Sequence, residues 1–135
     1  MVLFLRKRDS SEIGDKSAPY RTKKDIVSRQ HDVEYAQINF PNKVPVIVEK
    51  HKKDKRLPCL DRCKFLSPPD LTLAQFLCII RNRMQIPPST SLFLFNEKEH
   101  TVCSLSSTVG TVYEKFKDKD DGFLYLTYAA QEAFG

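Results

Sequence analysis

One segment, residues 72–84, constrains the fold most because its pattern is that of a complete amphipathic helix. Thr72 followed three residues later by Gln75 is a capping box, a common start of a helix. Apolar side chains then recur at helical spacing, at Leu73, Phe76, Leu77, Ile80 and Met84. Proline pairs at 68–69 and 87–88 bound the segment. The sequence therefore predicts one helix whose apolar face packs on other elements.

A hairpin is expected before this helix. Residues 44–49 are mostly β-branched and predict a strand, in which Pro45 must occupy a position whose N–H is not needed. Residues 62–67 predict the returning strand, and the charged run 50–56 forms the tip between them.

After the helix, residues 92–95 are continuously apolar and predict a strand at the centre of the sheet. Residues 109–116 predict a short helix. The last strand, residues 123–128, follows the turn signal Asp121-Gly122.

The whole chain then divides into an arm and one domain. Residues 1–19 show no sustained periodicity and predict a mobile arm. Residues 20–135 predict a ubiquitin-like domain, with helices in 20–40, a core in 43–128 and a tail in 129–135. Two hairpin strands, a crossing helix and two further strands give an α+β fold, the ubiquitin-like β-grasp, with a four-stranded mixed sheet and an N-terminal helical extension.

Composition limits the function. The 135 residues carry 22 Lys and Arg against 17 Asp and Glu, and 41% are hydrophobic, which is typical of a globular protein. The apolar opening, residues 2–5, is too short for a signal peptide and precedes its basic residues, so we expect a soluble intracellular protein. The chain has four cysteines, Cys59, Cys63, Cys78 and Cys103. We expect them to be free thiols that hold no metal.

Charge is uneven along the chain. Residues 1–24 hold seven basic and three acidic residues, whereas residues 101–135 hold three basic and five acidic ones. The basic N-terminal segment, residues 1–24, favours acidic partners, either peptides or anionic lipid. Nucleic acid is not expected, because the basic run 50–56 lacks interleaved aromatic residues.

Catalysis is not expected either. The chain contains no GxSxG or HExxH motif, and its four glycines form no phosphate-binding loop. No cofactor is expected.

Several motifs in order resemble the ubiquitin-like autophagy modifiers, the family of microtubule-associated protein light chain 3 and the GABA-receptor-associated protein. The resemblance runs from about residue 20 to residue 135 and looks closest to the light chain 3 branch, its C form in particular. The motifs that carry it are Pro41-Asn42-Lys43-Val44-Pro45-Val46-Ile47-Val48-Glu49, Asp61-Arg62-Cys63-Lys64-Phe65-Leu66, Arg81-Asn82-Arg83, Asp121-Gly122-Phe123-Leu124-Tyr125-Leu126-Thr127-Tyr128 and Phe134-Gly135.

The resemblance implies a peptide groove, in which an extended aromatic-x-x-aliphatic peptide adds to an exposed strand edge formed by Lys64, Phe65 and Leu66. Its aromatic pocket would involve Asp32, Ala36, Pro45, Ile47, Lys64, Leu66 and Phe123. Its aliphatic pocket would involve Phe65, Ser67, Pro68, Leu71, Phe76, Ile79 and Arg83. Acidic residues flanking the peptide motif would be attracted by Lys23, Lys24, Arg62 and Lys64.

Simpler interpretations stand beside this one. Phe76 and Ile79 are also ordinary core residues, and Lys64 is also an ordinary solvent-facing lysine. Ala36 and Ser67 are smaller or more polar than the family pattern, which puts the motif preference in question.

The resemblance also implies chemistry at Gly135. A cysteine protease would expose this glycine, and ubiquitin-like activating and conjugating enzymes would join it covalently to phosphatidylethanolamine. The protein would then lie on autophagosome membranes and recruit cargo receptors and adaptors, and otherwise be cytoplasmic. Alternatives are a modifier attached to protein lysines and a non-lipidated peptide-binding or cytoskeletal adaptor, with microtubules as a partner.

Overall fold

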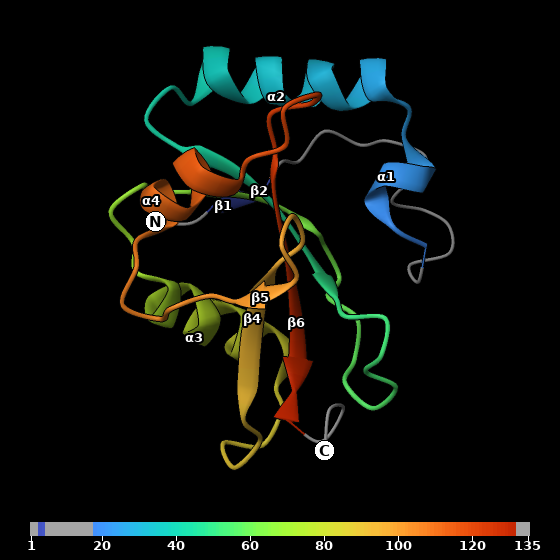
Figure 1. The fold of residues 1–135 in the computed structure, drawn as a ribbon, viewed down its shortest axis with the longest axis vertical. Coiled ribbons are helices and arrows are strands. Elements are labelled where there is room, and N and C mark those ends of the chain that lie inside the picture. Colours follow the sequence, from blue (N-terminus) through green and yellow to red (C-terminus); the bar gives the residue numbers. More distant parts are fainter. Residues whose placement is uncertain (1–2, 5–17, 132–135) are drawn as a thin grey trace.

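A mixed sheet of six strands carries the fold (Figure 1). The computed structural model describes residues 3–4 and 18–131. Its elements in chain order are β1 (Leu3–Phe4), α1 (Tyr20–Lys23), α2 (Ile26–Asn39), β2 (Val44–Lys50), β3 (Lys64–Ser67), α3 (Leu73–Met84), β4 (Leu92–Asn96), β5 (Thr101–Val102), α4 (Val109–Phe116) and β6 (Leu124–Ala130). The strand order is β1-β3-β2-β6-β4-β5. Among the described strands, β2 and β6 pair in parallel and every other pair is antiparallel, so the sheet is mixed as predicted.

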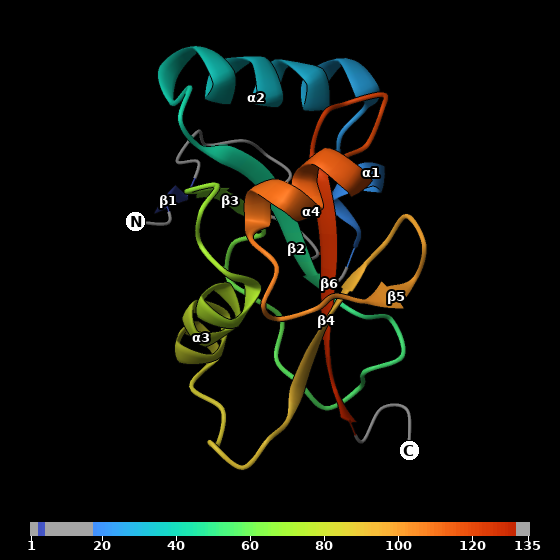
Figure 2. The ribbon, with the colours of Figure 1, turned by 60° about the vertical axis from the view of Figure 1, so that its left-hand side comes forward.

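Both faces of the sheet are covered, because the central strands are apolar on both sides. Val46 and Val48 of β2 belong to the main core, which is closed by α3 and α4. Ile47, between them in sequence, packs instead with Tyr20 of α1 and Val33 of α2. Figures 1 and 2 show α2 lying across one end of the sheet. The β-branched run thus holds the N-terminal helices on one face and the ubiquitin-like core on the other.

The helices after residue 70 follow the sequence prediction. The Thr72 side chain accepts a hydrogen bond from the Gln75 backbone N–H at 3.2 Å, and the Gln75 side chain accepts one from the Thr72 N–H at 3.0 Å. The predicted capping box is therefore confirmed, and α4 has the predicted bounds. The four predicted strands are β2, β3, β4 and β6, with ends shifted by up to two residues.

Strands β1 and β5 were not predicted, and the position predicted for β4 in the sheet is wrong. Strands β1 and β5 have two residues each and extend the expected four-stranded sheet at its edges, because the backbone groups of β3 and β4 can pair outward there. Strand β4 was expected at the centre but lies between β6 and the short β5. Phe93 and Phe95 are only half-buried, so its continuous apolar run does not mark a central strand.

The prediction of a mobile arm over residues 1–19 is wrong at Leu3–Phe4, which form β1. Residues 1–2 and 5–17 lie outside the described residues, so the prediction of a mobile arm stays untested there. Among the described segments, no helix is both long enough and apolar enough to cross a membrane.

Candidate functional site

Tyr20, the first residue of α1, fixes the N-terminal helices to the sheet. Its side chain is buried, and its hydroxyl donates a hydrogen bond to Oδ2 of Asp32 on α2. Its backbone N–H donates to Glu49 Oε2 of β2 at 2.8 Å. Its ring meets Phe123 edge-on, with 5.5 Å between centroids. One residue therefore joins α1, α2, β2 and the start of β6.

Asp32 is the centre of a buried polar cluster that we call the Asp32 cluster: Tyr20, Lys24, Asp32 and Lys64. The Nζ atom of Lys24 lies 2.6 Å from Asp32 Oδ2, and the Nζ atom of Lys64 on β3 lies 3.6 Å from the same oxygen. Lys64 is 1% exposed, so its predicted role as an ordinary solvent-facing lysine is excluded. Two lysines around one carboxylate leave an excess of positive charge beside β3.

The cluster changes how its members titrate. Burial alone would raise the pKa of Asp32, but hydrogen bonds from Lys24 and Tyr20 and the charge of Lys64 hold the pKa below its usual value. Burial lowers the pKa of Lys24, and the charge of Lys64 lowers it further. Burial, together with the hydrogen bond to Asp32, raises the pKa of Tyr20 well above its usual value. At neutral pH the carboxylate is therefore charged.

The residues predicted for the aromatic pocket lie together on the α1–α2 face of the sheet. Leu66 packs with Ala36, and Phe40 lies against both. Ile47 and Phe123 form the neighbouring apolar group with Tyr20. All seven predicted members are buried, namely Asp32, Ala36, Pro45, Ile47, Lys64, Leu66 and Phe123.

The residues predicted for the aliphatic pocket are more dispersed. Phe65 and Phe76 lie in the main core with ring centroids 5.5 Å apart, so the core interpretation of Phe76 is confirmed. Leu71 packs against that core from its margin. The rest range from the buried Ser67 through half-buried Pro68 and Ile79 to the exposed Arg83, which pairs with Asp61.

Strand β3 pairs on both sides. Its inner side pairs with β2, and its outer side pairs with β1 in the register Leu3↔Leu66 and Phe4↔Phe65. The predicted edge residues therefore lie on the expected strand. The expectation that this edge is exposed is wrong at Phe65 and Leu66, because the backbone of residues 3–4 pairs there.

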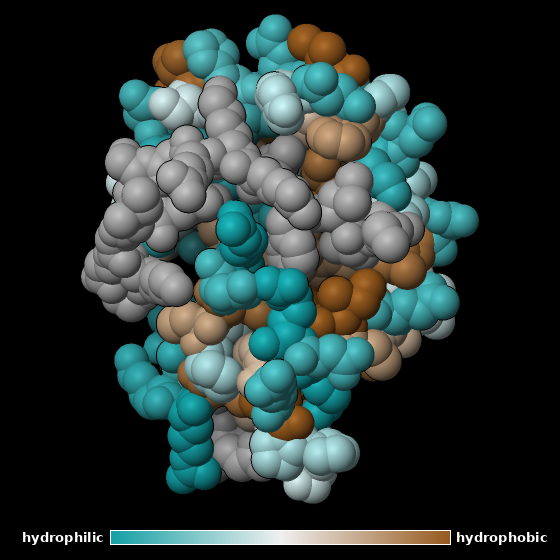
Figure 3. Space-filling model, turned by 180° about the vertical axis from the view of Figure 1, so that it is seen from behind, coloured by the Kyte–Doolittle hydropathy of each residue, from teal (hydrophilic) through white to brown (hydrophobic). Residues whose placement is uncertain are grey.

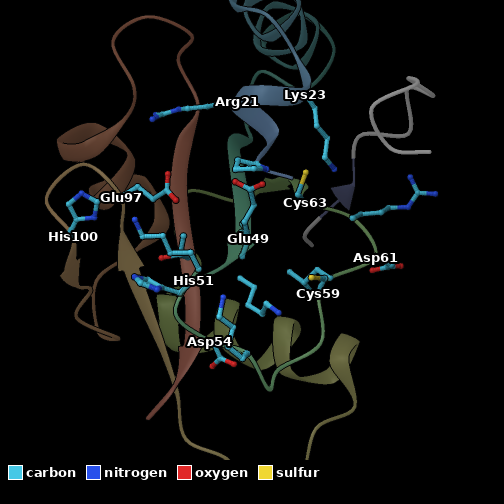
Figure 4. A pocket seen from close by; sticks show the side chains of 18 residues that line it. Arg21, Lys23, Glu49, His51, Asp54, Cys59, Asp61, Cys63, Glu97 and His100 are labelled. Carbon is cyan, nitrogen blue, oxygen red and sulfur yellow. The ribbon is translucent and has the colours of Figure 1, made fainter. Parts of the chain in front are cut away.

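A cavity of about 590 Å³ opens beside α1, between β2 and the loop that leads to β3 (Figure 4). Lys23 and Arg62, two of the residues predicted to attract acidic partners, line it. Its other charged residues are Arg21, Lys50, Lys52 and Lys55 together with Glu49, Asp54, Asp61 and Glu97. Burial raises the pKa of Glu49, and the charge of Glu97 raises it further. Six basic residues against four carboxylates favour an anionic occupant.

The surface seen from behind mixes hydrophilic and hydrophobic residues (Figure 3). On α2, Val27, Tyr35 and Ile38 are exposed apolar residues.

Within residues 3–4 and 18–131, no group of three or more His, Cys, Asp or Glu side chains is placed to hold a metal ion. The four cysteines carry no disulfide.

The tertiary contacts of three residues, Tyr20, Glu49 and Asp54, were not predicted from the sequence. The hydrogen bond from the Tyr20 backbone N–H to the Glu49 carboxylate joins residues 29 positions apart in the sequence. No local sequence pattern indicates such a contact. Asp54 sits in the predicted charged tip, yet its carboxylate is buried. It accepts hydrogen bonds from the backbone N–H groups of Leu57 at 2.9 Å and Ala130 at 2.8 Å.

Asp54 and Tyr128 anchor the end of β6, the strand that leads toward the C-terminus. The Tyr128 hydroxyl donates to the Pro58 carbonyl oxygen at 2.7 Å, and the Leu60 N–H donates to that hydroxyl at 3.1 Å. Gly135, the predicted attachment residue, lies outside the described residues.

Comparison with known proteins agrees with this architecture. The family described as "Autophagy protein Atg8 ubiquitin like" matches residues 28–135. Microtubule-associated protein 1 light chain 3 gamma from Homo sapiens is 43% identical over 117 residues, covering 87% of this chain and 78% of that protein. Protein lgg-2 from Caenorhabditis elegans is 38% identical over 128 residues, covering 95% and 97%. The crystal structure of Trypanosoma brucei ATG8 superposes with a TM-score of 0.78 at 36% identity, covering 84% of this chain and 95% of that one.

Proposed function

Because this chain belongs to the Atg8 ubiquitin-like family of autophagy modifiers, we propose that it captures aromatic-x-x-aliphatic peptides on β3 and is conjugated through Gly135 to phosphatidylethanolamine. In this role it recruits cargo receptors and adaptors to autophagosomal membranes. A processing cysteine protease and ubiquitin-like activating and conjugating enzymes are its partners in conjugation.

The observation that carries the peptide-binding proposal is the position of the Asp32 cluster beside a strand edge that accepts a further strand. Lys64 begins β3, and its side chain lies in the cluster. The pairing of β1 with Phe65 and Leu66 supports the idea that this edge adds an extended segment. Backbone hydrogen bonds would fix the peptide, and the side chains on either face of β3 would select it.

Two sources of affinity follow from the described residues. Burial of a large aromatic side chain against Ile47 and Phe123 contributes about 1.5–3 kcal/mol. The basic residues Lys23 and Arg62 attract the acidic flank of the peptide and mainly raise the association rate. Filling the site requires side chains around Leu66 to separate, because Leu66 and Ile47 are fully buried.

Calorimetric titration with an acidic Trp-x-x-Leu peptide tests this function. The matched control is the same peptide with alanine at both anchor positions. We expect micromolar binding of the first peptide and none of the second. Equal binding of both peptides would show that charge alone drives association, and it would contradict the two-pocket groove.

Conjugation at Gly135 is supported by family membership, because the residues that match the family, 28–135, include this glycine. Glycine lacks a Cβ, so its carboxylate can enter a narrow enzyme channel. The test is reconstitution with activating and conjugating enzymes of the family and vesicles containing phosphatidylethanolamine, followed by mass spectrometry. We expect a phospholipid adduct on Gly135 that is absent from Gly135→Ala. An adduct on protein lysines without lipid would instead support the alternative modifier role.

Microtubule binding is a second candidate. One relative is named as a microtubule-associated protein. In this chain, seven basic residues against three acidic ones in residues 1–24 favour an acidic polymer surface. Co-sedimentation with microtubules at rising salt tests it, and no pelleting at low salt would exclude it.

A further inference from the structure

We propose that strand β1 is an internal competitor for the peptide-docking edge of β3. In this arrangement the chain's own residues Leu3–Phe4 lower its affinity for aromatic-x-x-aliphatic peptides until they leave the edge. The inference rests on the proposed function, because it requires peptides to dock on β3.

Sheet topology makes the two occupants mutually exclusive. The inner side of β3 is paired with β2 along Lys64–Ser67, so only its outer side can accept another strand. There Leu3 stands opposite Leu66 and Phe4 opposite Phe65. Each backbone N–H and C=O of an edge pairs with one neighbouring strand at a time. A peptide that pairs with Phe65 and Leu66 must therefore displace β1.

The connection between β1 and the rest of the chain makes this competition effective. Fifteen residues, 5–19, separate Phe4 from Tyr20. Tyr20 lies close to the start of β3, because the Lys64 Nζ atom is 5.8 Å from its ring centroid. A connection of this length can span roughly 50 Å when extended, so it reaches the edge easily. A tethered strand on such a connection has an effective concentration on the order of millimolar.

The pairing is also short enough to be reversible. It involves two residues, whereas β2 and β3 pair through four. A pairing this short does not occupy the edge of β3 permanently. It reduces the apparent affinity for the peptide by the fraction of molecules in which it forms. If about 70–90% of molecules are paired, the apparent Kd rises about 3- to 10-fold.

The test compares the full chain with two variants in peptide titration. Leu3→Pro combined with Phe4→Pro removes both backbone N–H groups and prevents strand pairing. Leu3→Val combined with Phe4→Tyr keeps residues that favour strands and is the matched control. We expect the proline variant to bind the acidic Trp-x-x-Leu peptide about 3- to 10-fold more tightly. The control should bind like the unmodified chain.

Equal affinities of the full chain and the proline variant would overturn the inference while leaving the peptide groove intact. A gain that depends on protein concentration would also overturn it, because it would show that β1 pairs with a second copy. If none of the three proteins binds, the proposed peptide binding fails and the competition fails with it.

Nuclear Overhauser effects give an independent readout of the pairing. In the free full chain we expect cross-strand contacts between residues 3–4 and residues 65–66, and we expect saturating peptide to abolish them. Contacts that persist at saturation would contradict displacement. Absence of these contacts in the free chain would contradict the pairing itself.

Discussion

The Tyr20 hydroxyl donates a hydrogen bond to the same Asp32 oxygen that lies 3.6 Å from Lys64 Nζ. One buried carboxylate thus connects the N-terminal helices with the strand on which we propose that peptides dock. Changes at the helical extension should therefore affect both stability and binding.

Tyr20→Phe tests the connection with a minimal change. The variant keeps the buried ring and its packing on Phe123 but loses the hydrogen bond to Asp32. We expect the free energy of unfolding in urea to fall by about 1–2 kcal/mol. An unchanged free energy would show that the hydroxyl does not support the fold.

Asp32 should make the protein sensitive to acid. Its pKa is lower in the folded chain than its usual value of 3.8, so its ionisation favours the folded state above that value. This stabilisation is lost as the pH falls through the folded pKa. Asp32→Asn removes it. We expect the two proteins to differ most in unfolding free energy at neutral pH, and we expect the difference to shrink as the pH falls below 3.8 toward the folded pKa of Asp32. A constant difference across this range would contradict the prediction.

Asp54→Ala should destabilise the loop before β3 and the end of β6. The substitution leaves the N–H groups of Leu57 and Ala130 without their acceptor. We expect a loss of about 2–3 kcal/mol in unfolding free energy. Lys55→Ala is the matched control, because Lys55 is the exposed neighbour in the same loop. Equal effects of the two substitutions would contradict an anchoring role for Asp54.

Gly122→Ala should strain the entry into β6. Gly122 has a φ of +86°, a conformation that residues with a side chain rarely adopt, and an added Cβ would lie 3.1 Å from Val33 Cγ1. We expect a loss of about 1–2 kcal/mol, measured by thermal or urea unfolding. A stability equal to that of the unmodified chain would show that the turn adapts.

Arg62→Ala should weaken binding of acidic peptides through long-range attraction. Arg62 lines the basic cavity beside α1. We expect a two- to five-fold weaker Kd, on the order of the effect of a rim charge, and a smaller dependence on salt. Lys119→Ala, an exposed lysine outside the cavity lining, is the control and should leave binding unchanged. An equal loss in both variants would point to net charge instead of the cavity.

Local signals in the sequence predicted the elements that local interactions define. The Thr72–Gln75 capping box located α3, and the β-branched run located β2. The prediction of a mixed sheet in a β-grasp followed from the order of these elements.

Contacts between distant residues explain what the sequence did not predict. Strand β1 forms through backbone pairing with residues more than 60 positions away. The two apolar residues Leu3 and Phe4 are too short a pattern to predict a strand. The partner of Asp54 at Ala130 lies 76 positions away. The predicted pocket residues were placed by resemblance, and the structure shows which of them, such as Phe76, belong to the core.

The position of a bound peptide tests the central claim most directly. An isotope-labelled acidic Trp-x-x-Leu peptide would be titrated into the full chain, and intermolecular nuclear Overhauser effects would be recorded. We predict backbone contacts to residues 64–67 and contacts from the Trp ring to Ile47 and Phe123. Contacts centred on the half-buried Phe93 and Phe95 of β4, with residues 64–67 unaffected, would contradict it.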